Sequence, residues 1–401
     1  MRFDAAVIGS GPAGATAARL LAQAGWSVAL IERTGFPRRK VCGEFISAAT
    51  MPVLEACGVT ADFLARAGPP VRKVAAYAGR TMVEAPLPHA TGWGRALGRE
   101  YLDLLLRDAA IAAGAILFQP AEVTALSRQV DGHLLTLRRA GAAAEIGARI
   151  VIVACGSWST KGPFVVNAPP RPSDLFAFKA HFCGAALADG VMPLLAFPGG
   201  YGGMVHSDGG RVSLSCCMRR DALGRARERH AGRAGEAVIR HIVASTEGVR
   251  RALQGASVLG PILATGPIRP GIRTRYGDGM FFAGNIAGEA HPIIAEGISM
   301  AIQSSWLLTQ CLLAAGPAVG PRYARAWNRH FAARMHAAAV FAWLAMNDHS
   351  RAGAAHLIRA FPAILTWGAA LSGKAVPVAS RRSADTGVGY HGQTRLGLDN
   401  K

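Results

Sequence analysis

Residues 3–33, FDAAVIGSGPAGATAARLLAQAGWSVALIER, have the pattern of a strand, a tight glycine turn, a helix and a second strand that ends in an acid. The turn carries Gly9, Gly11 and Gly14 in the spacing G-x-G-x-x-G. In this spacing the first glycine permits the sharp turn, the second lets a pyrophosphate approach the backbone, and the third lets the helix pack closely on the strand. Glu32 follows Gly14 by 18 residues, the place of a carboxylate that accepts the hydroxyls of an adenosine ribose. The stretch predicts dinucleotide binding, with a plain βαβ unit as the alternative.

The composition is that of a large, basic, globular chain. With 401 residues, 51% of them hydrophobic, the chain can bury a sizeable core, and its length favours two domains or one with an insertion. Lys and Arg number 44 against 25 Asp and Glu, which gives a net charge of +19. These residues are spread along the chain without interleaved aromatic residues, so we expect no nucleic-acid partner. The densest basic set, Arg219 to Arg233, is either a solvated helix or a surface that docks on an anionic membrane, carrier or substrate.

The cysteines and the absence of long apolar runs bear on location. The seven cysteines are odd in number and include no C-x-x-C, which indicates free thiols in a reducing compartment. The first predicted strand begins at residue 3, which leaves no room for a signal peptide, and no transmembrane span is evident. We therefore expect a cytoplasmic protein, with peripheral membrane contact left open. No set of His, Cys and Asp shows metal-ligand spacing, so we expect no metal site. The sequence does not indicate the oligomeric state.

The pattern along the whole chain predicts an α/β fold with α+β insertions. Residues 116–153 alternate like a meander and end in a buried strand, and short glycine-divided apolar segments over 171–270 favour a separate antiparallel sheet. The predicted divisions are 1–165 (Rossmann-type domain with the inserted meander), 166–275 (antiparallel substrate domain), 276–320 (return to the first domain), 321–374 (helical C-terminal region) and 375–401 (a tail expected to be disordered).

Three segments suggest a family. They are GSGPAG at 9–14, REYLDLLLRDAAIAAGA at 99–115 and GNIAGEAHPIIAEGISMAIQSS at 284–305. With them, roughly residues 1 to 345 resemble the flavoprotein group that contains geranylgeranyl reductases, p-hydroxybenzoate-type hydroxylases and flavin halogenases. The loop PRRKVCGEF is similar to the P-x-x-K-x-C-G element of geranylgeranyl reductases, and GGYGGMVHSDGGRVSL to their GGYGW-type sheet segment. The resemblance implies FAD in the Rossmann-type site, a lipophilic small-molecule substrate between the flavin and the second sheet, and NAD(P)H as a candidate electron donor.

The late segment supports a flavin from its residues alone. Asn285 follows a buried strand, so its amide can meet a ribityl hydroxyl or a phosphate at the sheet edge. The resembled family usually has aspartate at this position. Pro292 sets a loop, and the helix that opens at Gly297 and Ile298 can point unpaired N–H groups at the pyrimidine edge of the flavin, which becomes anionic on reduction. An ordinary glycine-opened helix is the alternative.

Two basic residues complete the predicted cofactor site. The resemblance places Arg99 near the FAD phosphate or ribityl region, with an ordinary helix N-terminal arginine as the alternative. Lys40 is a candidate for contact with the flavin or the diphosphate, and a surface lysine is the competing interpretation. The full predicted cofactor-binding set is Gly9, Gly11, Pro12, Ala13, Gly14, Glu32, Arg33, Lys40, Arg99, Gly284, Asn285, Pro292, Gly297 and Ile298.

Cys42 and Glu44 are the predicted catalytic residues. In the resembled reductases the cysteine that corresponds to Cys42 lies by the flavin, where a thiol can donate a proton or position an alkene. The neighbouring basic residues 38–40 favour a thiolate, and a buried inert cysteine is the alternative. Glu44 is a candidate acid, with a loop-surface carboxylate as the alternative. His181 and His206 flank the predicted second sheet and either contact substrate or are satisfied by a backbone carbonyl.

Departures from the family narrow the predicted reaction. In VACGSWSTKG, Cys155 replaces the aspartate of the hydroxylase element A-D-G-x-x-S-x-x-R, and no arginine follows at the matching position. Both departures argue against a hydroxylase. The W-x-W-x-I-P signature of halogenases is absent. We therefore predict a FAD-dependent oxidoreductase that reduces a C=C bond of a lipophilic isoprenoid or polyketide-like molecule by hydride transfer from flavin N5. The alternatives are an aromatic monooxygenase, and less favourably a halogenase or a non-catalytic flavin-binding protein.

Overall fold

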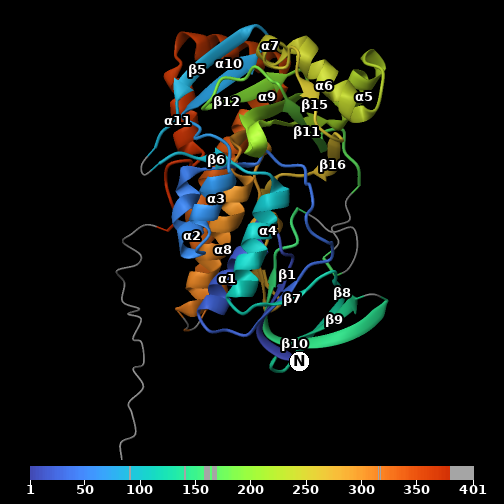
Figure 1. Cartoon of the computed structure of the whole chain (residues 1–401), viewed down its shortest axis with the longest axis vertical. Helices are drawn as coiled ribbons and strands as arrows, with labels where there is room; N and C mark the ends of the chain where they lie inside the picture. Colours follow the sequence, from blue (N-terminus) through green and yellow to red (C-terminus); the bar gives the residue numbers. More distant parts are fainter. Residues whose placement is uncertain are drawn as a thin grey trace, which may run out of the picture.

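A computed structural model of the chain describes residues 1–89, 92–139, 141–157, 163–164, 169–314, 316 and 318–379. Figure 1 shows two sheets, one near each end of the long axis, with a group of helices beside the lower sheet and a second group around the upper sheet. The mixture of parallel and antiparallel sheets with helices confirms the predicted α/β class with α+β insertions.

The lower sheet contains the Rossmann-type core. Its strand order is β18-β19-β10-β1-β2-β7, and every pairing from β19 to β7 is parallel. Helices α1, α4 and α8 lie side by side against this sheet, with α1 in contact with both others (Figure 1). The strands are β1 (Arg2–Ile8), β2 (Val28–Ile31), β7 (Ile116–Phe118), β10 (Ala142–Val153), β18 (Tyr276–Gly277) and β19 (Met280–Phe282), and the helices are α1 (Pro12–Gln23), α4 (Arg99–Ala112) and α8 (Gly297–Leu313).

The long strand β10 joins the predicted meander to this core. Its first half pairs antiparallel with β9 (Gly132–Arg139), which pairs with β8 (Glu122–Gln129). Its second half pairs parallel with β1 and β19. The buried apolar run over 151–153 suits a central strand, because parallel strands are covered on both faces. Strands β8, β9 and the first half of β10 therefore form an antiparallel meander joined to the parallel core.

The upper sheet has the order β15-β11-β14-β13-β12-β4-β5, with β16 also paired to β11. It differs from the predicted boundaries at one place. Strands β4 and β5 lie within 1–165, yet they join this sheet, and β4 pairs parallel with β12. The alternation of a strand predicts its faces and not its distant partner, so this crossover was not visible in the sequence. The strands are β4 (Lys73–Ala78), β5 (Thr81–Pro86), β11 (Leu175–Cys183), β12 (Val191–Phe197), β13 (Gly200–His206), β14 (Val212–Arg219), β15 (Ser257–Val258) and β16 (Leu263–Ile268).

The remaining helices surround the two sheets. The basic stretch after residue 220 is helical, as predicted, and the helical C-terminal region consists of α9, α10 and α11. Residues 380–401 of the predicted tail lie outside the described residues. The helices are α2 (Met51–Ala56), α3 (Thr60–Arg66), α5 (Arg220–Arg229), α6 (Ala234–Ser245), α7 (Glu247–Ala252), α9 (Val319–Met346), α10 (Asp348–Ala360) and α11 (Ala363–Leu371), and two short ladders pair β3 (Phe45–Ile46) with β6 (Arg95–Ala96) and β17 (Gly271–Ile272) with β20 (Gly288–Glu289).

Within the described part of the chain, no single helix has the length and hydropathy needed to cross a membrane. Helices α10 and α11 reach that length and hydropathy only when they are taken together, and the chain bends by 113° between them.

Candidate active site

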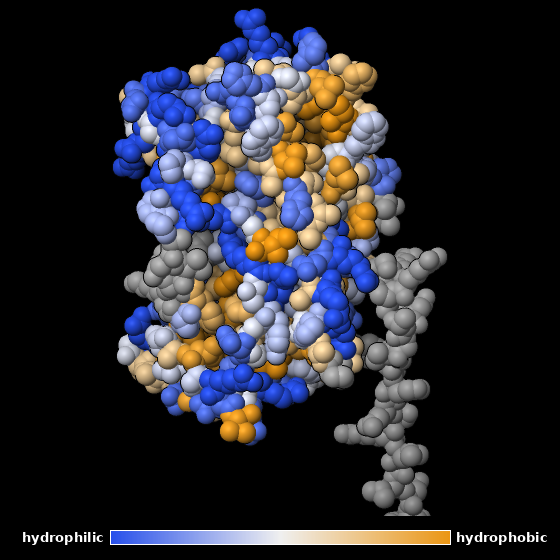
Figure 2. Space-filling model, turned by 180° about the vertical axis from the view of Figure 1, so that it is seen from behind, coloured by the Kyte–Doolittle hydropathy of each residue, from blue (hydrophilic) through white to orange (hydrophobic). Residues whose placement is uncertain are grey.

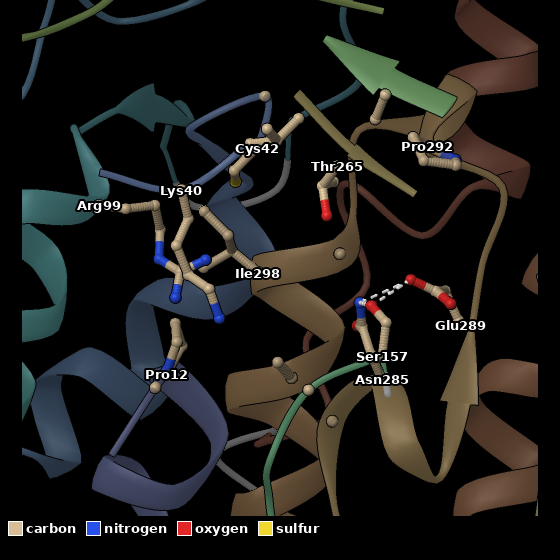
Figure 3. Close-up of a pocket in the computed structure, with 18 of the residues that line it drawn as sticks. Pro12, Lys40, Cys42, Arg99, Ser157, Thr265, Asn285, Glu289, Pro292 and Ile298 are labelled. Atoms are coloured by element: carbon tan, nitrogen blue, oxygen red, sulfur yellow. Dashed lines mark hydrogen bonds between the residues drawn. The ribbon is translucent and has the colours of Figure 1, made fainter. Parts of the chain in front are cut away.

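A cavity of about 680 Å³ lies between the two sheets. Residues at or just beyond the carboxyl ends of β1, β2, β10 and β19 line one side, and residues of β13 and β14 line the other. Ligands of open parallel sheets bind at this edge. Every predicted cofactor-binding residue except Gly14 lines this cavity, as do Cys42 and Glu44. The two glycine-containing turns, more than 250 residues apart, therefore converge on one space (Figure 3).

The three glycines of the first turn occupy three different environments. Gly9 has a φ of 103°, and a Cβ there would lie 2.6 Å from the Ala154 carbonyl oxygen. A Cβ on Gly14 would lie 1.8 Å from the carbonyl oxygen of Gly9, so only glycine permits this helix–strand packing. Gly11 faces the cavity, and its nearest neighbour would be an Arg99 nitrogen at 3.7 Å. No side chain caps the start of α1, so its N–H groups are available to an anion.

Two cations face that helix start. Figure 3 shows the side chains of Lys40 and Arg99 side by side and reaching toward Pro12, Arg99 from the start of α4 and Lys40 from the segment between β2 and β3. Arg99 is held by a two-bond pair with Asp103, at 2.6 and 2.8 Å, and this carboxylate raises the pKa of Arg99 despite its burial. Desolvation in the cleft, together with the nearby positive charges of Arg99 and Arg38, lowers the pKa of Lys40 to about 8. Like charges gathered beside an uncapped helix start suit a diphosphate.

Glu32 lies at the end of β2, as predicted, and is already well bonded. Its oxygens accept hydrogen bonds from the N–H groups of Ser10 and Thr34, both at 3.0 Å, and from the Arg38 guanidinium at 2.8 and 3.2 Å. Burial alone would raise the pKa of Glu32, but Arg38 and these N–H donors outweigh it and lower the pKa. A ribose hydroxyl must therefore share or displace the contact with Arg38. Arg33 lies at the exposed rim of the cavity.

Asn285 bonds with a glutamate that the sequence analysis did not single out. Its amide nitrogen donates to Ser157 Oγ at 3.1 Å and to Glu289 Oε1 at 3.2 Å. Glu289 is buried and also pairs with Arg273 at 3.1 Å. An aspartate at position 285 would place a second negative charge beside the Glu289 carboxylate, whereas the asparagine amide donates a hydrogen bond to it. This difference explains why asparagine replaces the aspartate that is usual in the family. Asn285, Ser157 and Glu289 form one wall of the cavity in Figure 3.

The start of α8 is held by the C-terminal region. Glu296, fully buried, accepts hydrogen bonds from Ser47 Oγ and from Lys374 Nζ, both at 2.9 Å. Lys374 also donates to the carbonyl oxygen of Ile294 at 2.5 Å. Gly297 and Ile298 follow directly and line the cavity. The positions of Gly297 and Ile298 thus depend on Lys374, which follows α11. No local sequence pattern predicts this contact between Lys374 and Glu296.

Cys42 lies at the boundary between the basic and the apolar parts of the cavity. Its sulfur accepts the backbone N–H of Glu44 at 3.3 Å and contacts the Arg99 guanidinium. The side chain is partly exposed to the cavity. The predicted catalytic residue is therefore within reach of bound molecules and is not buried in the core.

Glu44 belongs to a buried ionic cluster. It has a φ of 62°, is fully buried, and bonds to Lys179 Nζ and to His181 Nε2, the latter at 2.9 Å. Although burial opposes ionisation, His181 and Lys179 lower the pKa of Glu44 to about 2. A carboxylate held ionised does not suit a proton donor. Lys179 and His181 are two residues apart in the apolar strand LFAFKAHF, so both side chains lie on the same face of it. Two basic side chains on one face of an apolar strand could have indicated a buried anion opposite them.

The two predicted histidines differ in their partners. His181 bonds to Glu44 and does not line the cavity, and the ring of His206 bonds to the Leu187 carbonyl oxygen at 2.7 Å. A residue missed by the sequence analysis, Tyr201, does line it, and its hydroxyl lies 3.1 Å from His291 Nδ1. Burial lowers the pKa of His291 to about 4, so this ring is neutral at ordinary pH. The described residues contain no group of three metal-ligating side chains.

Residues 2–167 match the sequence family described as FAD binding domain. Over 162 residues the chain is 32% identical to a menaquinone reductase of Mycobacterium tuberculosis, a match that covers 40% of this chain and 39% of that protein. Digeranylgeranylglycerophospholipid reductase 2 of Methanopyrus kandleri is 28% identical over 324 residues, 74% of each chain. Residues 2–167 thus match a FAD-binding domain, and the chain is similar to reductases named for menaquinone and digeranylgeranylglycerophospholipid. Its cofactor is FAD.

The fold of this flavoprotein is shared more widely than its sequence. The solved structure of the flavin-dependent brominase Bmp2 superposes with a TM-score of 0.77 and 18% identity, covering 93% of this chain and 94% of the brominase. At this identity the likeness concerns the fold alone. It does not separate reduction from halogenation or hydroxylation, so the choice between these reactions depends on the residues of the cavity.

Proposed function

We propose that this flavoprotein reduces a carbon–carbon double bond of a lipophilic isoprenoid or polyketide-like molecule. The observation that supports this most is the two-sided cavity, which is basic around the start of α1 and lined by the upper sheet opposite. Met192, Leu194, Met204 and Val205 contribute apolar side chains to that second side. Relatives named for menaquinone and digeranylgeranylglycerophospholipid agree with a lipid-like substrate.

The residues of the cavity fit FAD in this proposal. The uncapped start of α1, Lys40 and Arg99 would hold the diphosphate, and Glu32 the adenosine ribose. Asn285 would meet the ribityl chain, and the N–H groups at Gly297 and Ile298 the pyrimidine edge. When bound and reduced, FAD supplies a hydride to one alkene carbon. The helix dipole at Gly297 then stabilises negative charge at that edge.

In this proposal Cys42 donates the proton or positions the alkene. A thiol at the boundary of the cavity can donate a proton to the second alkene carbon or orient the alkene. Glu44, proposed from the sequence as an acid, has a different role here, because its carboxylate is engaged by Lys179 and His181. Through its backbone N–H it fixes the Cys42 sulfur. Glu44 is thus a positioning residue.

The mass of the product tests the reaction. Photoreduced enzyme is incubated with a polyprenyl quinone or a geranylgeranyl lipid, under argon and in air. We expect a product heavier by two hydrogens in both gases, because hydride transfer needs no oxygen. A product heavier by one oxygen and formed only in air would replace this proposal with the monooxygenase. Photoreduction makes the result independent of the natural electron donor, for which NAD(P)H is the candidate.

Replacing Cys42 by alanine tests its role. We expect Cys42→Ala to keep its FAD content and to lose about 100-fold in kcat, the usual contribution of a positioned proton donor. Cys183→Ser is the matched control, since Cys183 is exposed and does not line the cavity. Single-turnover oxidation of photoreduced flavin by substrate measures the rate. Unchanged turnover in Cys42→Ala would make this cysteine structural.

The pH dependence of FAD binding tests Lys40. Its pKa of about 8 in the free protein means that the positive charge is present below pH 8 and is lost above it. A bound diphosphate favours the protonated form, so affinity falls as pH rises. Between about pH 7.5 and 9.5 we expect the Kd of the apoprotein for FAD to rise about tenfold. Lys40→Arg, charged throughout, should show a flat profile by flavin fluorescence. A flat wild-type profile would remove Lys40 from the diphosphate site.

A further inference from the structure

The C-terminal helices carry a cluster of exposed apolar side chains. We define the C-terminal apolar surface as Val340, Trp343, Leu357, Phe361, Trp367, Leu371 and Val376, which are between 51% and 66% exposed. Helices α9, α10 and α11 contact one another, and α10 and α11 also contact β4 and β5, so they form a layer on the upper sheet. Figure 2 shows hydrophobic residues gathered on the upper right of the molecule, the side on which α11 lies when Figure 1 is turned by 180°.

The exposed charges around this surface are mainly positive. Residues 319–379 contain a single acidic residue, Asp348, and seven Lys and Arg, of which Arg325, Arg329 and Arg359 are exposed while Arg334 and Lys374 are buried. Asp348 pairs with Arg351 at 2.7 Å, which leaves the region positive. A surface that combines exposed tryptophans with near absence of acids is complementary to an anionic bilayer, where aromatic rings sit at the headgroup level and basic residues meet acidic lipids. The net charge of +19 acts in the same direction.

The inner side of this surface adjoins the cavity. Leu365 and Ala369 are the buried residues of α11, and they pack in one cluster with Phe45, Met192 and Val205. The last three line the cavity. One continuous apolar cluster therefore extends from the buried side of α11 to the cavity. The bend of 113° between α10 and α11 suits helices that lie along a surface.

We propose that the C-terminal apolar surface docks this protein on an anionic lipid bilayer. Trp343 and Trp367 enter the headgroup region, and the basic residues of α9 and α10 face the acidic lipids. Docking brings the cavity close to hydrocarbon, so a lipophilic substrate can leave the bilayer with little exposure to water. Only this last step rests on the proposed function, because binding to a membrane does not depend on the reaction.

Vesicle binding tests the docking. Full-length, FAD-loaded protein is floated with vesicles of phosphatidylcholine alone and with about 30 mol% phosphatidylglycerol. We expect binding to the anionic vesicles, and a loss of about tenfold or more in partitioning for the double variant Trp343→Ser/Trp367→Ser. The matched control is Ile116→Ser/Val130→Ser, which removes two exposed apolar residues, 51% and 103% exposed, from β7 and from the turn between β8 and β9. This control should bind as the wild type does.

Further readouts separate the outcomes. Brominated lipids should quench tryptophan fluorescence in the wild type and much less in the double variant, while unchanged FAD content and thermal unfolding show that the variant is folded. The docking proposal is overturned if the wild-type protein does not bind anionic vesicles, or if the double variant binds them as well as the wild type does. A concentration-dependent dimer that the same substitutions abolish, without vesicle binding, would assign the surface to a second copy. Membrane binding with no alkene product would leave docking intact and reject the proposed reaction.

Discussion

Gly11→Val is expected to give a folded protein that has lost its FAD. The backbone at Gly11 has φ −77° and ψ −175°, which valine adopts readily, and a Cβ there meets no atom closer than 3.7 Å. The branched side chain would instead project into the cavity beside Arg99, where we place the diphosphate. We expect the Kd for FAD to rise by at least about 100-fold, from the loss of about 3 kcal/mol of binding free energy. Absorbance of the purified protein and titration with FAD measure this.

Gly14→Val is the informative comparison. Its Cβ would lie 1.8 Å from the carbonyl oxygen of Gly9, so we expect this variant to lose the fold as well as the cofactor. Circular dichroism separates the two results. If Gly11→Val remained yellow with a wild-type FAD content, the cofactor would not cross this turn, and the assignment of the whole basic side of the cavity would be wrong.

Glu44→Ala is expected to lower the free energy of unfolding by about 3–5 kcal/mol, because it leaves Lys179 and His181 buried without their anion. Alanine keeps the unfavourable φ of 62°, so the loss reports the ionic cluster and not the backbone. Chemical denaturation of the FAD-loaded protein measures it. A role as catalytic acid alone predicts the opposite combination, a large fall in kcat with nearly unchanged stability.

A second substitution shows whether the cluster is the cause. In Glu44→Ala/Lys179→Met the buried cation is removed together with its partner, and we expect most of the lost stability to return. Turnover should stay reduced in both variants, because the loop that carries Cys42 is no longer anchored on β11. If Lys179→Met lowered the free energy of unfolding further in the Glu44→Ala background, the two residues would not be energetically coupled.

The sequence indicated which glycine turns would meet at the cavity, because that side of the cavity is made largely of backbone. Turns that bring N–H groups to the end of a parallel strand need glycine at fixed spacings, so Gly9, Gly11, Gly14 and Gly297 are visible in the sequence. The meander was visible for a similar reason, since strand alternation and the Asp131-Gly132 turn are local features.

Contacts between distant side chains were not predictable in the same way. Glu44 meets Lys179 and His181 across 135 and 137 residues, and no spacing rule joins a loop to a strand so far away. The place of β4 in the upper sheet depends on the same kind of long-range pairing. The role of Asn285 became clear only with Glu289 beside it, because the chemical reason for an amide there is the neighbouring carboxylate.

The ion pair between Glu296 and Lys374 has a consequence for how the protein matures. The two residues are 78 positions apart, so the ribosome releases Glu296 well before its partner has been synthesised. Until Lys374 arrives, burial of that lone carboxylate is unfavourable, and the loop that opens α8 lacks its final shape. We therefore expect stable binding of the yellow cofactor to be a late event in biogenesis, completed once α11 and Lys374 have taken their places.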